Sequence, residues 1–330
     1  MGRRNGYAAG RVAAPGGAFC LKAAALRHRP GPVFVHDDSD VPRATPGHRA
    51  TLGVSITPPA GPVPPISMTS SVSVLAQSHA LDAEQQAFFH RHGYLILRAL
   101  AGPSECAALL AAARAALENA VPPVELETDV GYAGAPASRE AEGGHTVRRL
   151  LDADSRGTPF TDWARDARVA GPIAQLIGAP VRLSLAHHNC VMTKHPAFGT
   201  ATHWHRDSRY WSFARSELVS AWLALMEETV DNGCLWVIPG SHTLDLPAGR
   251  FDDKLFLRPD LPENRALIDT ARPVPLLPGD VLLFHCNTFH AARANQTGAI
   301  KFSLVTTYYG TDNAPLPGTR SSARPDPLVG

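Results

Sequence analysis

The sequence has few cysteines and no long apolar run. Its five cysteines are scattered along 330 residues, are odd in number and include no C-x-x-C pair. This usage argues against a disulfide framework and for a reducing compartment, so we predict a cytoplasmic protein. No apolar run approaches the roughly 20 residues that a membrane-spanning helix needs, which argues against a membrane protein.

The sequence also lacks a strong charge of either sign. Its formal net charge is +1, and 44% of its residues are hydrophobic and 18% charged, as is ordinary for a soluble globular protein. The charge is uneven, because residues 1–67 hold eight Lys or Arg and three Asp. Nothing in this pattern indicates a nucleic-acid surface. We therefore expect a small-molecule partner rather than nucleic acid or membrane, and the oligomeric state stays open.

Residues 1–67 show neither helical nor strand periodicity and are rich in Pro, Gly, Ala and Arg. Three interpretations stay open for this segment. It is a disordered, low-complexity tail that cannot offset its chain entropy, a targeting peptide, since residues 1–36 contain no acid, or a stretch upstream of a true start at Met68. The folded pattern begins soon after Met68.

Helical patterns come first in the folded part. Asp82 and Gln85 form a capping box that opens a helix, and Gly93 ends it. A short strand is predicted over 94–97 and a second helix from 102 to the Pro122-Pro123 pair. Two short helices are predicted over 160–177, and residues 124–145 are predicted to be a loop.

Strand patterns follow, at 182–194, 201–205, 218–226, 234–238, 281–284 and 300–309, with a loop-like stretch over 243–273. Short strands without βαβ alternation predict a double-sheet jelly roll. We expect one mostly β domain over residues 78–312, with the N-terminal helices packed outside the jelly roll. Residues 313–330 are predicted to be a flexible C-terminal tail.

Three side chains form a candidate metal site. His205 and Asp207 are two positions apart in a segment predicted to be a strand end, so both can leave the same face. His290 follows the apolar run 281–284, which is predicted to be a buried strand. Two imidazoles and one carboxylate with open positions are the facial triad of non-haem Fe(II) oxygenases. The local rivals for the two imidazole positions are His203 and His285.

Five stretches, in this order and spacing, resemble the phytanoyl-CoA dioxygenase family of Fe(II)/2-oxoglutarate oxygenases. They are FFHRHGYLIL within 86–97, HWHRD at 203–207, VSAWLAL at 219–225, NGCLWVIPGSH at 232–242 and PGDVLLFHCNTFHAARANQT at 278–297. The resemblance implies a double-stranded β-helix, Fe(II) on His205, Asp207 and His290, use of 2-oxoglutarate and O₂, and release of succinate and carbon dioxide. Halogenating relatives have a small residue in place of Asp207, so hydroxylation or a related oxidation is favoured here.

The resemblance also implies residues for 2-oxoglutarate. The family has Arg eleven positions after the distal His, whereas this sequence has Lys301, a point charge rather than a planar fork. Arg293, in the turn after His290, is the second candidate for the distal carboxylate. Trp222 matches a family tryptophan beside the co-substrate, and Ala292 replaces a common family hydroxyl. Further cation candidates are Arg148, Arg149 and Lys194.

The function predicted from the sequence is hydroxylation of an unidentified small molecule by an iron oxidoreductase. Substrate contacts are expected from loops around the barrel mouth, with 243–273 as a lid. Two alternatives stay open: a cupin-like metal-dependent isomerase or lyase that uses no keto acid, and a non-catalytic metal-binding module. The candidate substrate-contacting side chains are Arg206, Arg209, Tyr210, Trp211, Arg258 and Arg265.

Overall fold

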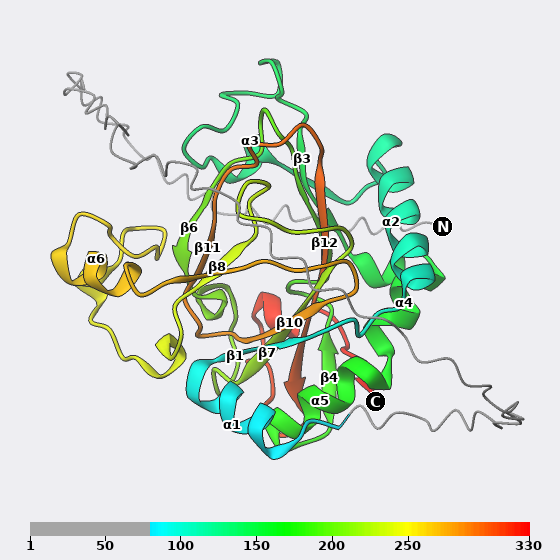
Figure 1. Ribbon diagram of the computed structural model, residues 1–330, viewed down its shortest axis with the longest axis vertical. Coiled ribbons are helices and arrows are strands. Elements are labelled where there is room, and N and C mark those ends of the chain that lie inside the picture. Colours follow the sequence, from blue (N-terminus) through cyan, green and yellow to red (C-terminus); the bar gives the residue numbers. More distant parts are fainter. Residues whose placement is uncertain (1–79) are drawn as a thin grey trace, which may run out of the picture. The chain divides into compact units, whose positions relative to one another are not determined.

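A computed structural model describes residues 80–330 (Figure 1), so the interpretations of residues 1–67 and Met68 lie outside the described residues. The helices are α1 (Ala83–His92), α2 (Pro103–Glu118), α3 (Glu127–Val130), α4 (Thr158–Arg165), α5 (Ala167–Ile177) and α6 (Pro262–Ile268). The strands are β1 (Tyr94–Leu97), β2 (Val124–Leu126), β3 (Val147–Leu151), β4 (Val181–Ser184), β5 (Cys190–Lys194), β6 (Thr202–His205), β7 (Leu218–Ala224), β8 (Leu235–Val237), β9 (Arg272–Val274), β10 (Val281–His285), β11 (His290–Ala292), β12 (Lys301–Gly310) and β13 (Leu328–Val329).

The strands form two sheets that face each other. The larger has the order β1-β10-β7-β12-β5-β3-β2, with β4 paired to β12 and β13 to β4, and the smaller has the order β6-β11-β8-β9. Each pairing between these strands is antiparallel. Two facing antiparallel sheets without βαβ crossovers confirm the predicted jelly roll.

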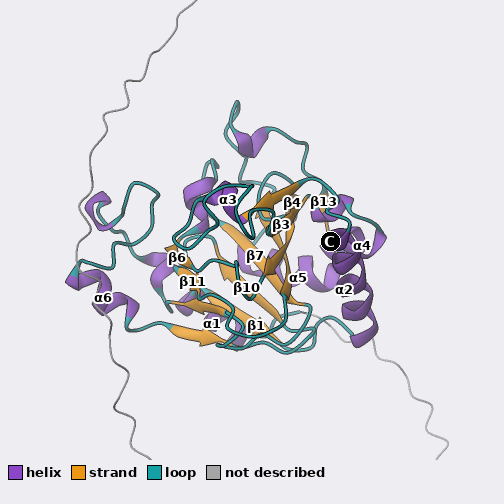
Figure 2. Ribbon diagram, turned by 90° about the horizontal axis from the view of Figure 1, so that it is seen from above, coloured by secondary structure: helices purple, strands orange, loops and turns teal. Residues whose placement is uncertain are grey.

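The helices α2, α4 and α5 lie together on the outer side of the larger sheet (Figure 2). Their buried side chains, such as Leu109, Trp163 and Ile173, share one apolar cluster with Val219 and Leu304 of the sheet. The helices therefore pack outside the jelly roll, as predicted. No helix among residues 80–330 is long and apolar enough to cross a membrane.

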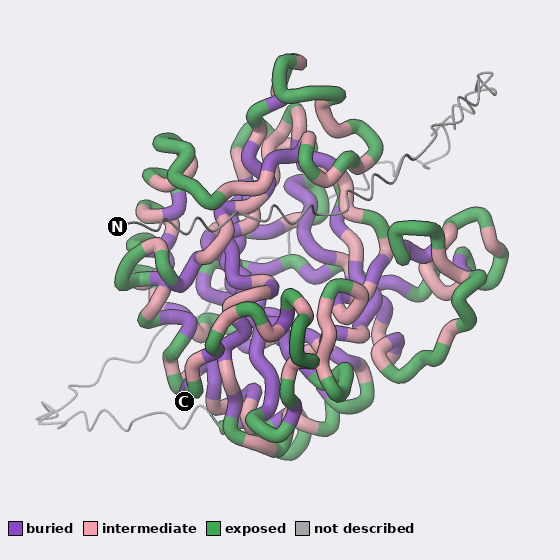
Figure 3. The backbone as a smooth tube through the Cα atoms, turned by 180° about the vertical axis from the view of Figure 1, so that it is seen from behind, coloured by how far each residue is buried: buried purple, intermediate pink, exposed green. Residues whose placement is uncertain are grey.

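Strand β7 is buried at all seven positions. Ala221 and Leu223 face the helices, whereas Trp222 and Ala224 belong to a second apolar cluster shared with the smaller sheet. A central strand covered on both faces has no polar side, which explains why its sequence alternates only partly. In Figure 3 the buried residues run through the central strands, and the exposed ones mark the outlying loops.

The sequence predicts helix α1 and strand β1 correctly. The Asp82 carboxylate accepts a hydrogen bond from the Gln85 backbone N–H at 2.8 Å, and Oε1 of Gln85 accepts one from the Asp82 backbone N–H at 3.0 Å. Gly93 ends the helix in the left-handed conformation (φ 77°). A Cβ at this position would lie 2.5 Å from Nδ1 of His242 and 2.6 Å from Oγ1 of Thr288, so both φ and space require glycine here.

The prediction of one long strand over 182–194 is wrong. The structure has two strands, β4 and β5, which both pair with β12 and are separated by residues 185–189. His188 in this break has φ 36°, a conformation that non-glycine residues rarely adopt. The apolar pattern continues on both sides of the break because both strands pack on the same neighbour.

Residues 313–330 also differ from the predicted flexible tail. Strand β13 pairs with β4, and the Tyr309 hydroxyl donates a hydrogen bond to Asp326 at 2.9 Å. The Ser321 hydroxyl oxygen accepts a hydrogen bond from the Ser212 backbone N–H at 2.9 Å and lies 2.7 Å from Nε2 of His187. The Pro- and Gly-rich composition of residues 313–330 indicates a loop. The segment is nevertheless ordered, because residues distant in sequence pair and hydrogen-bond with it.

The segments predicted as loops contain short elements. Residues 124–145 begin with β2 and α3, and residues 243–273 include α6 and the start of β9. Helix α6 has Pro262 at its first position, a start signal that favours a helix. The seven-residue length leaves too few turns for a clear apolar stripe, so the helix escaped prediction.

Asp280 joins the turn before β10 to the end of β1. Its carboxylate accepts hydrogen bonds from the backbone N–H groups of Ala99 and Leu277, both at 2.9 Å, and from Arg98 at 2.6 Å. Burial works to raise the pKa of Asp280, but these hydrogen bonds outweigh it and lower the pKa. The stabilisation is complete above the pKa of an unfolded aspartate, about 3.9, and is lost as the pH falls through the lowered value.

We expect Asp280→Ala to lower the free energy of unfolding by about 2–4 kcal/mol, because two backbone donors lose their partner. Urea denaturation at neutral pH measures the loss. The control is Asp260→Ala, which removes only an exposed ion pair with Arg258 and should leave stability unchanged. Equal losses in both variants would contradict the role of the Asp280 hydrogen bonds.

Candidate metal centre

The two candidate histidines lie opposite each other on neighbouring strands. His205 is the last residue of β6 and His290 the first of β11, and the antiparallel register pairs them directly. Their ring centroids are 4.2 Å apart. The sequence analysis expected Asp207 at the end of the strand. In the structure Asp207 instead begins the 3-10 turn η2 (Asp207–Tyr210) just beyond β6. The turn directs the carboxylate back toward the two rings.

The three side chains place their ligand atoms around one point. Oδ1 of Asp207 lies 3.7 Å from Nε2 of His205 and 3.6 Å from Nε2 of His290. One ligand atom from each residue lies within 4.8 Å of the other two, and all three residues are buried. The structure therefore brings together the set that the sequence predicts for a metal.

Backbone carbonyls orient both rings. Nδ1 of His205 lies 2.7 Å from the carbonyl oxygen of His203, and Nδ1 of His290 lies 3.0 Å from that of Thr288. Because a carbonyl only accepts, each Nδ1 carries the proton and each Nε2 keeps its lone pair for a metal. This tautomer follows from the partners of each ring rather than from observed hydrogens.

The electrostatics of the site also suit a cation. Burial lowers the pKa of His205 and of His290, so both rings are neutral at physiological pH. Burial works to raise the pKa of Asp207, but the nearby imidazoles of His188 and His290 lower it, so the carboxylate is charged. Neither Asp207 oxygen has a well-directed hydrogen bond within residues 80–330, although Oδ2 lies 3.1 Å from Nδ1 of His188. Such anionic oxygens beside two neutral nitrogens fit a divalent metal ion.

His188 lies next to the candidate metal site. Its Nδ1 lies 3.1 Å from Oδ2 of Asp207, and its ring meets Trp211 edge-on with centroids 5.3 Å apart. The break between β4 and β5 brings it there. A periodic strand pattern carries no sign of this break, although the consecutive polar residues His187, His188 and Asn189 could have indicated it.

The rival histidines lie elsewhere. The exposed ring of His203 packs against Phe256. The ring of His285 faces that of His242, with centroids 5.4 Å apart. Neither residue belongs to the metal-ligand group found among residues 80–330.

A cavity between the two sheets borders the candidate metal site, and we call it the inner cavity. Its walls include His205, His290, Trp222 and Phe284 and the four cations Arg148, Arg149, Lys194 and Lys301. Ala292 also lines it, at the position where the family pattern has a hydroxyl. Arg293 does not line this cavity, because its guanidinium stacks over Trp236 at 4.8 Å beside a different cavity.

Lys301 and Trp222 share one buried partner that the sequence analysis missed. The Lys301 ammonium lies 2.7 Å from Oε2 of Glu228. Oε1 of Glu228 accepts hydrogen bonds from Nε1 of Trp222 at 2.8 Å and from the hydroxyl of Ser303 at 2.6 Å. Glu228 lies between β7 and β8, where no periodic pattern marks it as buried.

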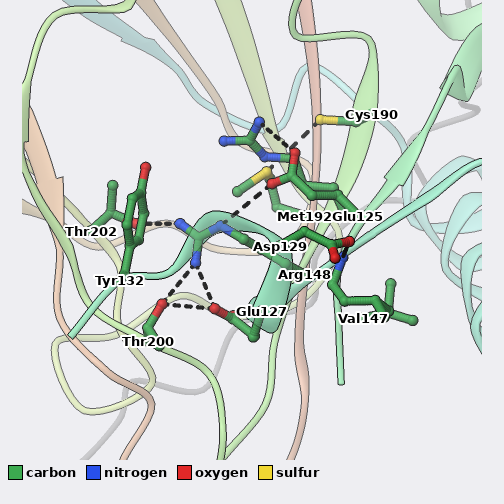
Figure 4. A network of polar contacts seen from close by, with 12 residues as sticks. Glu125, Glu127, Asp129, Tyr132, Val147, Arg148, Cys190, Met192, Thr200 and Thr202 are labelled. Carbon is green, nitrogen blue, oxygen red and sulfur yellow. Dashed lines mark hydrogen bonds and ion pairs between the residues drawn. The ribbon is translucent and has the colours of Figure 1, made fainter. Parts of the chain in front are cut away.

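Arg148 anchors a second polar network beside the inner cavity (Figure 4). Its guanidinium donates hydrogen bonds to Glu127 and Thr200, both at 3.0 Å, and to Thr202 at 2.7 Å. Arg148 and Glu127 are both almost fully buried. Because Thr202 begins β6, this network fixes the strand that carries His205.

An adjoining space of about 230 Å³, the outer cavity, lies on the other side of His188. His188 and Arg149 line both cavities. Tyr210 and Trp211, two of the candidate substrate-contacting side chains, line the outer cavity. Arg206 instead bonds the carbonyls of Ser241 and Leu244. The outer cavity is also lined by Glu125, Tyr132, His187 and Arg320.

Comparisons with known proteins agree with this geometry. The family model described as phytanoyl-CoA dioxygenase (PhyH) matches residues 89–303. The ectoine dioxygenase of Sphingopyxis alaskensis is 28% identical over 250 residues, which are 71% of this chain and 77% of that protein.

Two solved structures are similar over most of their length. EctD from S. alaskensis with 2-oxoglutarate and 5-hydroxyectoine is 25% identical, with a TM-score of 0.59 over 74% of this chain and 82% of that chain. The epimerase SnoN from nogalamycin biosynthesis, in complex with Fe³⁺, alpha ketoglutarate and nogalamycin RO, is also 25% identical, with a TM-score of 0.58 over 75% and 95%. Because the family model matches more than half of the sequence, this chain belongs to the phytanoyl-CoA dioxygenase (PhyH) family.

Proposed function

We propose that this chain is an Fe(II)- and 2-oxoglutarate-dependent dioxygenase that hydroxylates a small molecule and releases succinate and carbon dioxide. The observation that carries the proposal is the convergence of His205, Asp207 and His290 on one point, beside a cavity whose wall includes His205, His290 and Lys301. The family and the relatives support iron, 2-oxoglutarate and O₂ as its cofactors, since EctD holds 2-oxoglutarate and SnoN holds Fe³⁺ with alpha ketoglutarate.

The metal ligands and the residues that line the inner cavity have separate roles in this proposal. His205, Asp207 and His290 would hold the iron, because their neutral imidazoles and charged carboxylate fit a divalent cation. Bound iron, 2-oxoglutarate and O₂ supply the oxidising chemistry. Phe284 packs its ring 5.0 Å from that of His290 and helps to exclude water. Trp222 and Lys301 would contact 2-oxoglutarate from the far wall of the inner cavity.

The outer cavity is the proposed substrate site. It meets the metal site at His188 and is small enough to select a compact molecule. Aromatic walls at Tyr210 and Trp211 and a cation at Arg320 favour a moderately apolar ligand with at least one polar group.

Epimerisation is the second candidate reaction, because the similar protein SnoN is an epimerase. An enzyme that uses no keto acid is no longer favoured, since relatives at 25% identity hold 2-oxoglutarate. A non-catalytic module is disfavoured by the complete ligand set.

Anaerobic addition of Fe(II) and 2-oxoglutarate tests the proposal. We expect the metal-to-ligand absorption band of a bound 2-keto acid, and then succinate release with O₂ and a screen of small molecules. A hydroxylated product gains one oxygen atom in mass spectrometry, whereas an epimerised product keeps its mass. Metal uptake without the band would exclude 2-oxoglutarate chemistry, and absence of metal uptake would exclude the iron site.

A further inference from the structure

The outer cavity has two different ends, which a chain of contacts connects. At one end His188 lies beside the metal site, with Nδ1 3.1 Å from Oδ2 of Asp207. The indole of Trp211 packs on two imidazoles, with centroids 5.3 Å from that of His188 and 5.7 Å from that of His187. Nε2 of His187 in turn lies 2.7 Å from Oγ of Ser321. The contacts therefore run from the metal end of the cavity to the C-terminal segment.

Arg320 lies at the end that the C-terminal segment forms. It directly precedes Ser321, whose hydroxyl also accepts a hydrogen bond from the Ser212 backbone N–H at 2.9 Å, so these contacts fix the position of the segment. The side chain of Arg320 lines the outer cavity. Its guanidinium forms no hydrogen bond or ion pair within residues 80–330, so its N–H donors are available to a ligand.

The carboxylates of the outer cavity already have partners. Glu125 lies 3.4 Å from Arg149, which lines the same cavity. Asp152 lies 2.6 Å from Arg324. Each pair is neutral as a whole and adds no net charge to the cavity.

His187 adds no charge either. Burial, together with the nearby Arg320 guanidinium, lowers the pKa of His187 to about 4, so its ring is neutral at physiological pH. Arg320 is therefore the unmatched cation among the described residues that line the outer cavity.

Between the two ends the wall is largely apolar. Val130, Leu151 and Leu185 line it, together with Trp211. A space of about 230 Å³ with apolar sides and a cation at one end suits a compact molecule that has an apolar body and an anionic end. A single carboxylate matches the single excess charge, whereas a phosphate dianion would leave a negative charge without a partner.

We propose that the substrate is a compact amphipathic carboxylate. Arg320 binds its carboxylate, its apolar body lies along Trp211, and the C–H bond to be oxidised lies at the opposite end, beside His188. The inference rests on the proposed function, because it assumes that the outer cavity holds the substrate. In that reaction one oxygen atom of O₂ enters the C–H bond and the other enters succinate, while 2-oxoglutarate loses carbon dioxide. Arg320 is thus a specificity-determining residue outside the metal site.

Three probes with the same apolar body test the charge preference. They are 3-phenylpropanoate, 3-phenylpropanol and 3-phenylpropylamine, whose end groups are anionic, neutral and cationic. Isothermal titration calorimetry measures their dissociation constants for the anaerobic protein loaded with Fe(II) and 2-oxoglutarate. We expect the carboxylate to bind about 10-fold more tightly than the alcohol, as for a hydrogen bond between charged groups. A carboxylate that binds no more tightly than the alcohol, or not at all, would overturn the proposal.

A fourth probe, 2-phenylethyl phosphate, distinguishes the two kinds of anion. It should bind no more tightly than 3-phenylpropanoate, because the cavity has one unmatched positive charge. Tighter binding of the phosphate would overturn the assignment of a carboxylate.

Variants of Arg320 test the residue itself, and its exposed position means that they should fold. Arg320→Met should bring the dissociation constants of the carboxylate and the alcohol within about 2-fold of each other. Arg320→Lys should keep most of the preference, and Arg320→Glu should reverse it, so that the amine binds most tightly. The control Arg114→Met removes an exposed arginine of α2 that lines neither cavity, and all three constants should stay unchanged. A preference that survives Arg320→Met would place the carboxylate at Arg149 instead and overturn the proposal.

The position of the new hydroxyl tests the orientation. Any carboxylate substrate found in the succinate-release screen should gain its oxygen on the part of the molecule remote from the carboxylate, as tandem mass spectrometry can locate. Hydroxylation at the carbon next to the carboxylate would overturn the assigned orientation. Absence of the metal-to-ligand band would refute the proposed function, whereas a band without any preference for the carboxylate would refute this inference alone.

Discussion

Asp207→Ala is expected to abolish 2-oxoglutarate turnover, with a loss of at least about 100-fold, because it removes a metal ligand rather than an outer partner. Oδ1 of the Asp207 carboxylate faces both imidazoles, and Oδ2 lies 3.1 Å from Nδ1 of His188. Fe(II) affinity should fall together with turnover. Succinate release and metal content after dialysis measure the two effects.

The matched control is His203→Ala. His203 is two positions before His205, but its exposed ring packs on Phe256, and its backbone carbonyl, which orients His205, survives the substitution. Turnover and iron content should stay close to those of the parent. Retained turnover in Asp207→Ala, or an equal loss in His203→Ala, would show that the ligand assignment is wrong.

Glu127→Ala is expected to have the largest effect on stability. Arg148 and Glu127 are 3% and 1% exposed, so removing the Glu127 carboxylate leaves a buried guanidinium with only the more distant Glu125 carboxylate, 4.0 Å away. Breaking a buried ion pair from one side costs about 3–5 kcal/mol in the free energy of unfolding. Thr200 loses its hydrogen bond to Glu127 at the same time. Urea denaturation monitored by far-UV circular dichroism measures the loss.

Glu125→Ala is the comparison for this variant. Glu125 lies two positions earlier and pairs with Arg149 at 3.4 Å, but its side chain is 21% exposed. A partly solvated pair contributes about 1 kcal/mol or less. If Glu127→Ala destabilises the protein no more than Glu125→Ala does, the network around Arg148 does not stabilise the fold.

The clustering of His205, Asp207 and His290 could be predicted from the sequence because its geometry is local to two strand ends. His205 and Asp207 still direct their side chains to the same point, although Asp207 lies in a turn. The β6–β11 register places His290 opposite His205. The jelly roll could also be predicted from the sequence, because its strands are short and separated by turn residues.

The surroundings of the metal site could not be predicted in the same way. His188 approaches Asp207 through a break between two strands that share β12 as a neighbour, and a period-2 pattern does not register a break of this kind. Glu228 is buried because Lys301, 73 positions later, neutralises it. A sequence alone does not show this pairing.

The last stretch of the chain bears on how this enzyme could be re-engineered. Arg320 borders the outer cavity and Ser321 contacts the His187 ring, yet residues after β12 provide none of the three metal ligands. Grafting this terminal stretch from one relative to another would therefore reshape the cavity wall while leaving the iron chemistry intact.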